Sequence, residues 1–438
     1  MRVSNLIISN NIKLESKFTF CLVIAYIGES LFAKSMLSSI PFIWAIHMAV
    51  SIAITILIIF IFIRSKLYPI NKFAINIRKG IAVVVIFIGL WGIISAIFQL
   101  NSLSELLYII SWELMVIACF FAAPRLLIGF SSENIIKYAN YPLKIAILAS
   151  VLLAFTITFD PLNSRFNGIL GSVPAMGEVS MLCALLTFCQ ILFMKSKRKY
   201  WNIALFIASL ALLLLTRSRM PNVSLITAVL IIWLLNSRSK SNPLKFTIIF
   251  STFFLVFIYF NEANPILKTN FLQFLRFQEE SSSLFDTRTP LWNSAYTTIL
   301  KNPILGTGFT SRFSESGGMG ISARIKGDNS NLFNPGLYDP HNFYLSFGKS
   351  LGIPGLILSI VLVIYIIRMA IIIIFNYKYY NNIDLSILLG FCIIITILTI
   401  TSDPLISFGD IFDRYCWLFL GVFSVRYRST SHPKQVFI

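Results

Sequence analysis

Charged residues are scarce in this chain of 438 residues. Asp, Glu, Lys and Arg together make up 12% of it, whereas an average soluble domain has about one quarter. Hydrophobic residues make up 57%, and the mean hydropathy is +0.80. The apolar segments also lack the alternation of apolar and polar residues that transmembrane β-strands show. The composition therefore excludes one large soluble domain and predicts an all-α, polytopic membrane helical bundle.

Cysteine is scarce as well, and its placement excludes several kinds of chemistry. None of the cysteines has metal-ligand spacing, and none lies in the long polar stretch described below, so neither a metal site nor a disulfide is expected. We interpret them as small core residues. The sequence also has no Walker motif, no metal-ligand cluster and no Ser–His–Asp constellation, and we predict no metal and no cofactor. The six cysteines are Cys21, Cys119, Cys183, Cys189, Cys392 and Cys416.

Apolar runs long enough to cross a hydrocarbon core of ~30 Å occur about twelve times. One long polar stretch, residues 262–341, separates the ninth run from the tenth. We expect residues 1–438 to form a single integral-membrane domain with one large loop at 262–341. The predicted spans are 18–35, 41–63, 80–99, 106–123, 144–160, 178–195, 202–216, 221–236, 245–261, 352–375, 385–402 and 411–425.

In a soluble protein a net charge of +18 would suggest that it binds nucleic acid. Here the basic residues lie mainly in the loops between the apolar runs. Alternate loops are basic, and by the positive-inside rule they are cytoplasmic. Both termini join this set, and the N-terminal segment is expected to be a retained first helix. The loop 262–341 is then outside, which means periplasmic if the protein lies in the inner membrane of a Gram-negative cell and extracellular otherwise. No nucleic acid partner is expected. The basic residues include Arg64, Lys66, Arg78, Arg125, Lys137, Lys144, Lys197, Arg198, Arg238, Arg426 and Lys434.

Five arginines depart from this charge bias because they lie on the predicted outer side. Drawn from distant segments, they could converge on an anion, and the planar guanidinium suits phosphate because it donates two hydrogen bonds at once. Alternatively, each arginine reaches the lipid headgroups or pairs with a nearby aspartate. The two at which we favour a function are Arg219 and Arg288. The five are Arg165, Arg217, Arg219, Arg288 and Arg414.

His341 is the only histidine in the predicted outer loops. An imidazole with a pKa near neutrality can accept a proton from a sugar hydroxyl. The alternative is a residue at a helix start whose ring packs against Phe343 or Tyr344. Asp339 and Pro340 suit a helix start, which would hold His341 at the mouth of the tenth span.

Two pairs of glycines indicate backbone features close to His341. Gly306 and Gly308 are too few for a known phosphate-binding loop, and they predict a tight turn. Gly352 and Gly355 predict either close helix packing or a kink.

Four blocks of the sequence, read together, resemble the O-antigen ligase and polymerase (WaaL/Wzy) superfamily. They are similar to its Arg-x-x-Gly loop, its Ser-Arg element, its Arg-x-x-x-Trp and Pro-x-x-Gly-x-Gly segment, and its His-Asn signature. They occur in the expected order over roughly residues 160–360. The blocks are Arg165-Phe-Asn-Gly168; Thr216-Arg-Ser-Arg219; Asp286-Thr-Arg288-Thr-Pro-Leu-Trp292 with Asn302-Pro-Ile-Leu-Gly-Thr-Gly308; and His341-Asn342-Phe-Tyr344-Leu with Gly352-x-x-Gly355.

The resemblance implies a metal-independent glycosyltransferase that uses an undecaprenyl-diphosphate-linked glycan on the outer face. Carried over to these positions, Arg219 and Arg288 would bind the donor diphosphate, with Arg165 a third, and His341 would deprotonate or orient the acceptor hydroxyl. The doubled arginine leaves two candidates for one family position, and we choose Arg219 over Arg217 because it follows a serine. The other residues expected to bind substrate are Arg217, Asn342, Trp292 and Tyr344.

Two products fit this resemblance. A polymerase would join lipid-linked repeat units of O-antigen or capsule, whereas a ligase would pass the finished glycan to lipid A–core. Richness in Ile, Asn, Lys and Phe suggests an AT-rich gene of a serotype-specific cluster and favours the polymerase. The partners implied are the lipid-linked donor, the acceptor glycan or lipid A–core, membrane lipids and a chain-length regulator.

A flippase or transporter of the lipid-linked glycan is the alternative from another class. It would place charged residues in mid-membrane and show inverted repeats. Only Glu113 and Glu29 lie at depth in the predicted spans, and no repeat is evident. Glu113, a carboxyl within a span, is either a functional residue or satisfied by a polar neighbour. The titratable groups gather at the predicted outer edge, which favours a transferase.

Overall fold

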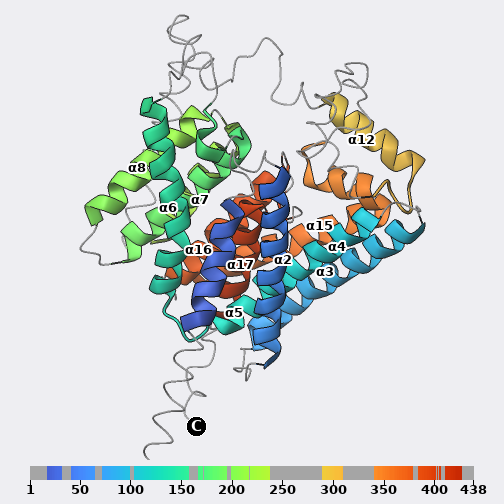
Figure 1. Cartoon of the computed structure of the whole chain (residues 1–438), viewed down its shortest axis with the longest axis horizontal. Helices are drawn as coiled ribbons and strands as arrows, with labels where there is room; N and C mark the ends of the chain where they lie inside the picture. Colours follow the sequence, from blue (N-terminus) through green and yellow to red (C-terminus); the bar gives the residue numbers. More distant parts are fainter. Residues whose placement is uncertain are drawn as a thin grey trace, which may run out of the picture.

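Every regular element in the described part of the chain is a helix, which confirms the all-α class (Figure 1). The computed structural model describes residues 17–31, 41–64, 72–98, 103–156, 166–170, 172–194, 199–216, 218–236, 289–308, 340–377, 383–400, 402, 404–405 and 410–426. Residues 17–31 are helical. The labelled helices are α2 (Pro41–Arg64), α3 (Lys72–Phe98), α4 (Leu103–Val116), the π-helix η2 (Ile117–Ala122), α5 (Ala123–Leu126), α6 (Ser132–Thr156), the 3₁₀ turn η3 (Gly168–Leu170), α7 (Val173–Phe193), α8 (Lys199–Leu215), α9 (Arg219–Asn236), α12 (Thr289–Lys301), α15 (Phe343–Tyr377), α16 (Ile383–Leu398) and α17 (Ile411–Arg426).

Within the described residues, five helical stretches are long and apolar enough to cross a membrane. Shorter apolar helices accompany them, so the chain is a multi-pass membrane protein. The predicted span 245–261 and most of the loop 262–341 lie outside the described residues, and the count of twelve spans stays a prediction. The five stretches are Arg78–Phe98, Leu106–Leu126, Ser132–Ala154, Val173–Phe193 and Phe343–Phe375.

The predicted basic loop before the fifth span is wrong, because α6 already begins at Ser132. Lys144 lies inside this helix, where its Nζ donates hydrogen bonds to Gln190 Oε1 (3.1 Å) and Asn202 Oδ1 (3.2 Å). Asn140, one turn earlier, donates to Thr187 Oγ1 at 3.0 Å. Partners on α7 and α8 thus satisfy polar groups that local hydropathy assigns to a loop.

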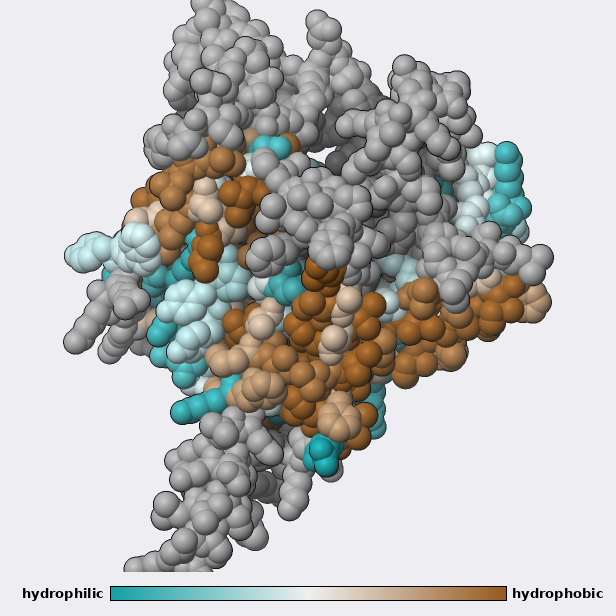
Figure 2. Space-filling view, viewed as in Figure 1, coloured by the Kyte–Doolittle hydropathy of each residue, from teal (hydrophilic) through white to brown (hydrophobic). Residues whose placement is uncertain are grey.

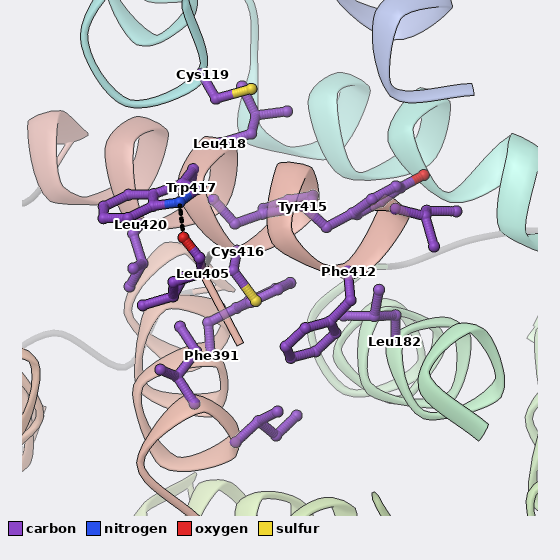
Figure 3. Packing of buried hydrophobic residues seen from close by; sticks show 14 of the residues in the cluster. Cys119, Leu182, Phe391, Leu405, Phe412, Tyr415, Cys416, Trp417, Leu418 and Leu420 are labelled. Carbon is purple, nitrogen blue, oxygen red and sulfur yellow. Dashed lines mark hydrogen bonds between the residues drawn. The ribbon is translucent and has the colours of Figure 1, made fainter. Parts of the chain in front are cut away.

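The core is centred on α17, whose residues from Ile411 to Leu420 are all buried (Figure 3). The indole nitrogens of Trp417 and Trp112 donate to the carbonyl of Leu405, at 3.1 and 2.8 Å. The amide of Leu405 in turn donates to Asp413 Oδ1 at 2.7 Å. Leu405, shortly before α17, is therefore held by hydrogen bonds to both of its backbone polar groups.

The cysteine prediction holds for five of the six residues. Cys119, Cys183, Cys189, Cys392 and Cys416 are buried, and all six are free thiols. Cys21 is exposed. The prediction that it belongs to the core is wrong, because Cys21 faces outward from its helix.

Arg414 is not part of an outer anion site, because its side chain is fully buried in α17. Its Nη1 donates to Tyr26 O (2.7 Å) and to Glu29 Oε2 (2.5 Å), and its Nη2 donates to Ser51. The guanidinium also lies 4.2 Å from the centre of the Tyr26 ring. His47 pairs with the same carboxylate. The contacts of Arg414 therefore join α17 to helix 17–31, through Tyr26 and Glu29, and to α2, through Ser51.

We expect Arg414→Ala to destabilise the fold by about 3–5 kcal/mol, because it leaves the Glu29 carboxylate buried without its main counter-ion. Arg64→Ala, which removes an exposed cation from α2, is the matched control and should change stability by about 0.5 kcal/mol or less. Thermal unfolding of the purified protein in detergent measures both. Equal midpoints for the two variants would show that the buried pair contributes little.

Candidate active site around His341

His341 stands directly before α15, and the residues that follow it are tied to the end of α16. The side-chain oxygen of Asn342 accepts from Leu345 N at 3.0 Å and so caps the helix. Its amide nitrogen donates to Ile400 O at 2.9 Å, and Phe343 N donates to Thr399 O at 3.1 Å. Asn342, predicted to bind substrate, thus anchors the start of α15 in this structure.

The residue before His341 is held from a third direction. Trp292, on α12, is half-buried, and its Nε1 donates to Pro340 O at 2.9 Å. The hydroxyl of Tyr344 lies 3.3 Å from Thr399 Oγ1. Of two more residues predicted to bind substrate, Trp292 thus contacts the residue before His341, and Tyr344, three residues after it, contacts the end of α16. Their roles in binding substrate stay predictions.

The backbone of His341 is strained while its side chain is exposed. Its φ of 47° lies in the left-handed region, which costs most residues about 1–2 kcal/mol but is visited by histidine more often than by most. Such strain persists only where the neighbours fix the conformation, and it tends to occur at functional sites. Here the neighbours are Pro340 and Asn342, and the imidazole between them is accessible.

α15 is broken at Gly352, whose φ of 72° and ψ of −164° are not helical. Of the two features predicted for Gly352 and Gly355, close helix packing or a kink, the structure has the kink at Gly352, and the helix starts at Phe343, nine residues before the predicted span. The break frees backbone groups, which pair with the turn after α12. The three bonds are Thr307 N to Lys349 O (2.8 Å), Gly308 N to Ser350 O (2.9 Å) and Ile353 N to Pro303 O (2.7 Å).

We call this contact between the turn after α12 and the kink in α15 the junction. It requires glycines because the backbones of the two segments are in direct contact there. A Cβ on Gly306 would lie 2.4 Å from the carbonyl carbon of Ser350, and one on Gly352 would lie 2.5 Å from Pro303 O. Gly306 and Gly308 also have φ of 68° and 85°, which confirms the predicted tight turn. Two separate blocks of the family resemblance are thus one structural unit.

We expect Gly352→Ala to disrupt this unit, since a backbone with φ and ψ in this region is essentially restricted to glycine and costs another residue about 1–3 kcal/mol. The contact with the Pro303 carbonyl adds to that cost. Gly129→Ala is the control, because a Cβ there meets nothing within 4 Å. Yield and unfolding temperature of the two variants in detergent give the comparison. A Gly352→Ala protein as stable as the control would contradict the described junction.

The junction also rests on α3, a span in which the sequence offered no motif. Trp91 Nε1 donates to Leu351 O at 3.1 Å, and Ser95 Oγ donates to Leu305 O at 2.6 Å. These contacts join residues more than 200 positions apart. A tryptophan and a serine four residues apart on one helix face are a weak signal, and sequence analysis missed them.

A backbone hydrogen bond joins two described segments that lie next to the predicted outer arginines in the sequence. Phe166, which follows Arg165, donates its amide to Leu215 O at 3.1 Å. Leu215 ends α8, and α9 begins at Arg219. Arg165, Arg217 and Arg288 lie outside the described residues, and for Arg219 only the backbone is described. The backbone bond joins Phe166 to the end of α8, four residues before Arg219 in the sequence.

Helix α16 contacts both α9 and the start of α15. α9 packs along α16, and the end of α16 carries the carbonyls of Thr399 and Ile400 that hold the start of α15. In Figure 1, α12 and the last turns of α6 lie toward one end of the bundle, and α5 lies toward the other. Within the described ranges, no group of three His, Cys, Asp or Glu side chains could hold a metal ion.

Residues 203–360 match the family model described as O-antigen ligase. The matched segment includes the Arg217–Arg219 turn, α12, His341 and the Gly352 kink, whereas the Arg165 turn precedes it. The fold is that of a multi-pass membrane protein, and over residues 203–360 the chain is similar to the O-antigen ligase family, which supports the resemblance seen in the motifs. A search of curated proteins gave no match.

Proposed function

We propose that this protein is a glycosyltransferase of the inner membrane that uses undecaprenyl-diphosphate-linked oligosaccharide on the periplasmic side. Our first choice is the polymerase of O-antigen or capsule repeat units. The observation that carries the proposal is His341, an exposed imidazole on a strained backbone that α12 and α16 hold from both sides. It lies within the segment that matches the family.

In the proposed reaction, His341 takes the proton of the acceptor hydroxyl. The hydroxyl oxygen forms a bond to the anomeric carbon of the donor sugar, and the bond from that carbon to the phosphate oxygen breaks. Undecaprenyl diphosphate leaves with added negative charge. Fixed guanidiniums stabilise that charge more in the transition state than in the ground state, so no metal is needed in this scheme.

Arg219 and Arg288 are the proposed donors to the diphosphate, with Arg165 as a third. Support for the group comes from the bond between Phe166, which follows Arg165 in the sequence, and Leu215, which lies four residues before Arg219. The first turn of α9 adds backbone N–H groups beside Arg219, a setting that favours an anion. Arg217 is the alternative to Arg219 in the same turn.

The site can act on a lipid-linked donor only if it faces the periplasm. We propose that both termini are cytoplasmic and that the loop 262–341 is outside, as the basic loops indicate. A reporter fused near Ser330 should be active only as a periplasmic enzyme. Activity of a cytoplasmic reporter at that position would reject this topology.

Deletion of the gene followed by a gel of surface polysaccharide tests the function. A polymerase predicts loss of the ladder while one repeat unit still caps lipid A–core. The second candidate, a ligase, is favoured by the description of the matched family. It predicts complete loss of capped lipid A–core and accumulation of lipid-linked polymer. An unchanged ladder would reject both, and loss of all periplasmic lipid-linked glycan would favour the flippase.

A further inference from the structure

We propose that α12 lies in the outer interface of the bilayer and presses an apolar stripe against lipid acyl chains. The stripe consists of Tyr296, Leu300 and Ile304, the last of these in the turn that follows the helix. The bilayer would then help to position Trp292 and, through Pro340, His341. The inference concerns a lipid contact and does not depend on which glycan the protein transfers.

The residues of α12 fall into three sectors when placed at 100° per residue. Ala295 and Ile299 are buried and face the protein. Tyr296 and Leu300, adjacent to them, are 59% and 58% exposed although both are large and apolar. The exposed polar residues Asn293, Thr297 and Lys301 occupy the sector beyond. If this side of the helix faced only water, the middle sector would be expected to carry polar residues.

The orientation of α12 is fixed by α15. Ile299 packs on Gly348, where a Cβ would lie 2.7 Å from its Cδ1. Trp292 is bonded to Pro340, and the turn after the helix is bonded to the kink in α15. The apolar stripe therefore cannot rotate into the core, and its exposure is a property of the assembled fold.

The stripe continues a surface that already faces lipid. The turn carrying Ile304, which is 63% exposed, is bonded to Ser95 near the outer end of α3. At that end Ile97 and Phe98 are 61% and 72% exposed. Figure 2 shows the hydrophobic residues that run along α3 to its end, whereas the part of α12 visible in that view is hydrophilic. The bond between Ser95 and the turn that carries Ile304 joins the stripe to the exposed apolar end of α3, and this link selects acyl chains as the occupant of the stripe.

The polar sector fits the same placement. Lys301 is exposed in the last turn of α12, directly beside Leu300. In an interfacial helix, the apolar stem of a lysine lies along the lipid boundary and its ammonium group reaches the phosphates. Contacts of the stripe with acyl chains and of Lys301 with headgroups would together hold α12 at a fixed depth in the bilayer interface.

Spin labels test this placement in the full-length protein, reconstituted in phosphatidylglycerol–phosphatidylethanolamine liposomes. Cys21→Ser removes the exposed thiol, and single labels are then placed by Leu300→Cys and Ile304→Cys, with Asn293→Cys and Thr297→Cys as matched controls. Collision rates with oxygen, which partitions into lipid, and with a water-soluble nickel chelate give the depth. The prediction is that labels at 300 and 304 collide at least several-fold more with oxygen than with nickel, and that the controls show the reverse.

Equal nickel accessibility at all four positions would overturn the proposal, because α12 would then stand in water. Shielding of positions 300 and 304 from both reagents would overturn it too, since protein would cover the stripe. Two stripe positions are used so that one poorly folding variant does not decide the outcome. The collision rates do not depend on transfer, so a failed function and a failed placement remain distinguishable.

Discussion

Replacing His341 with alanine is expected to lower glycan transfer by about 10²–10⁴-fold, the usual contribution of a general base, while the protein still inserts and folds. The imidazole is exposed, so its loss removes no core packing. Its backbone is held by Trp292 through Pro340 and by α16 through Asn342 and Phe343. Transfer is measured as the surface polysaccharide ladder in a deletion strain that carries the variant.

The His341→Asn variant removes the proton-accepting imidazole without changing the backbone conformation at this position. Asparagine also tolerates the left-handed conformation that this position adopts, but it cannot accept the proton. We therefore expect His341→Asn to be as inactive as His341→Ala and as stable as the wild type. Near-normal ladders from both variants would remove His341 from the catalytic assignment.

Arg219→Ala is expected to reduce transfer by about 10²–10³-fold. This is the usual loss of rate when one fixed hydrogen-bond donor to the negative charge of a transition state is removed from an enzyme. Arg288→Ala should have a similar effect. Arg219→Lys keeps the charge but loses the fork that binds two phosphate oxygens, so it should restore only part of the activity. Product formed per unit of protein from a lipid-linked donor in proteoliposomes is the measurement.

Arg217→Ala is the matched control, because Arg217 lies in the same turn with the same charge. A smaller loss for Arg217→Ala than for Arg219→Ala agrees with our assignment. A larger loss for Arg217→Ala would show that Arg217, and not Arg219, is the arginine of the family motif. Full activity of all three alanine variants would show that the diphosphate is bound elsewhere.

The sequence predicted those features that depend on local composition. Hydropathy places most helix ends within a few residues, for example α2 at Pro41–Arg64 against a predicted 41–63. The glycines predicted the kink at Gly352 and the turn at Gly306, since each needs a backbone that only glycine adopts readily. The order of the motifs predicted the family that the match at 203–360 supports.

What the sequence did not predict depends on contacts between distant segments. Lys144 was assigned to a loop because its partners, Gln190 and Asn202, lie on other helices. For Arg414 the sequence left an outer anion site, a lipid headgroup and a nearby aspartate as alternatives, because its counter-ion, Glu29, lies 385 positions away. Helix α12 was missed within the polar loop, since its amphipathic pattern is short and its partner is the start of α15.

The most direct test of the account uses the purified protein in proteoliposomes, supplied with the lipid-linked glycan that accumulates in the deletion strain. Mass spectrometry follows the release of undecaprenyl diphosphate and the growth of the glycan. The account predicts that wild-type protein releases undecaprenyl diphosphate and forms a longer or transferred glycan, and that His341→Asn protein does neither. An unchanged donor pool with wild-type protein, or equal turnover by the His341→Asn variant, would contradict it.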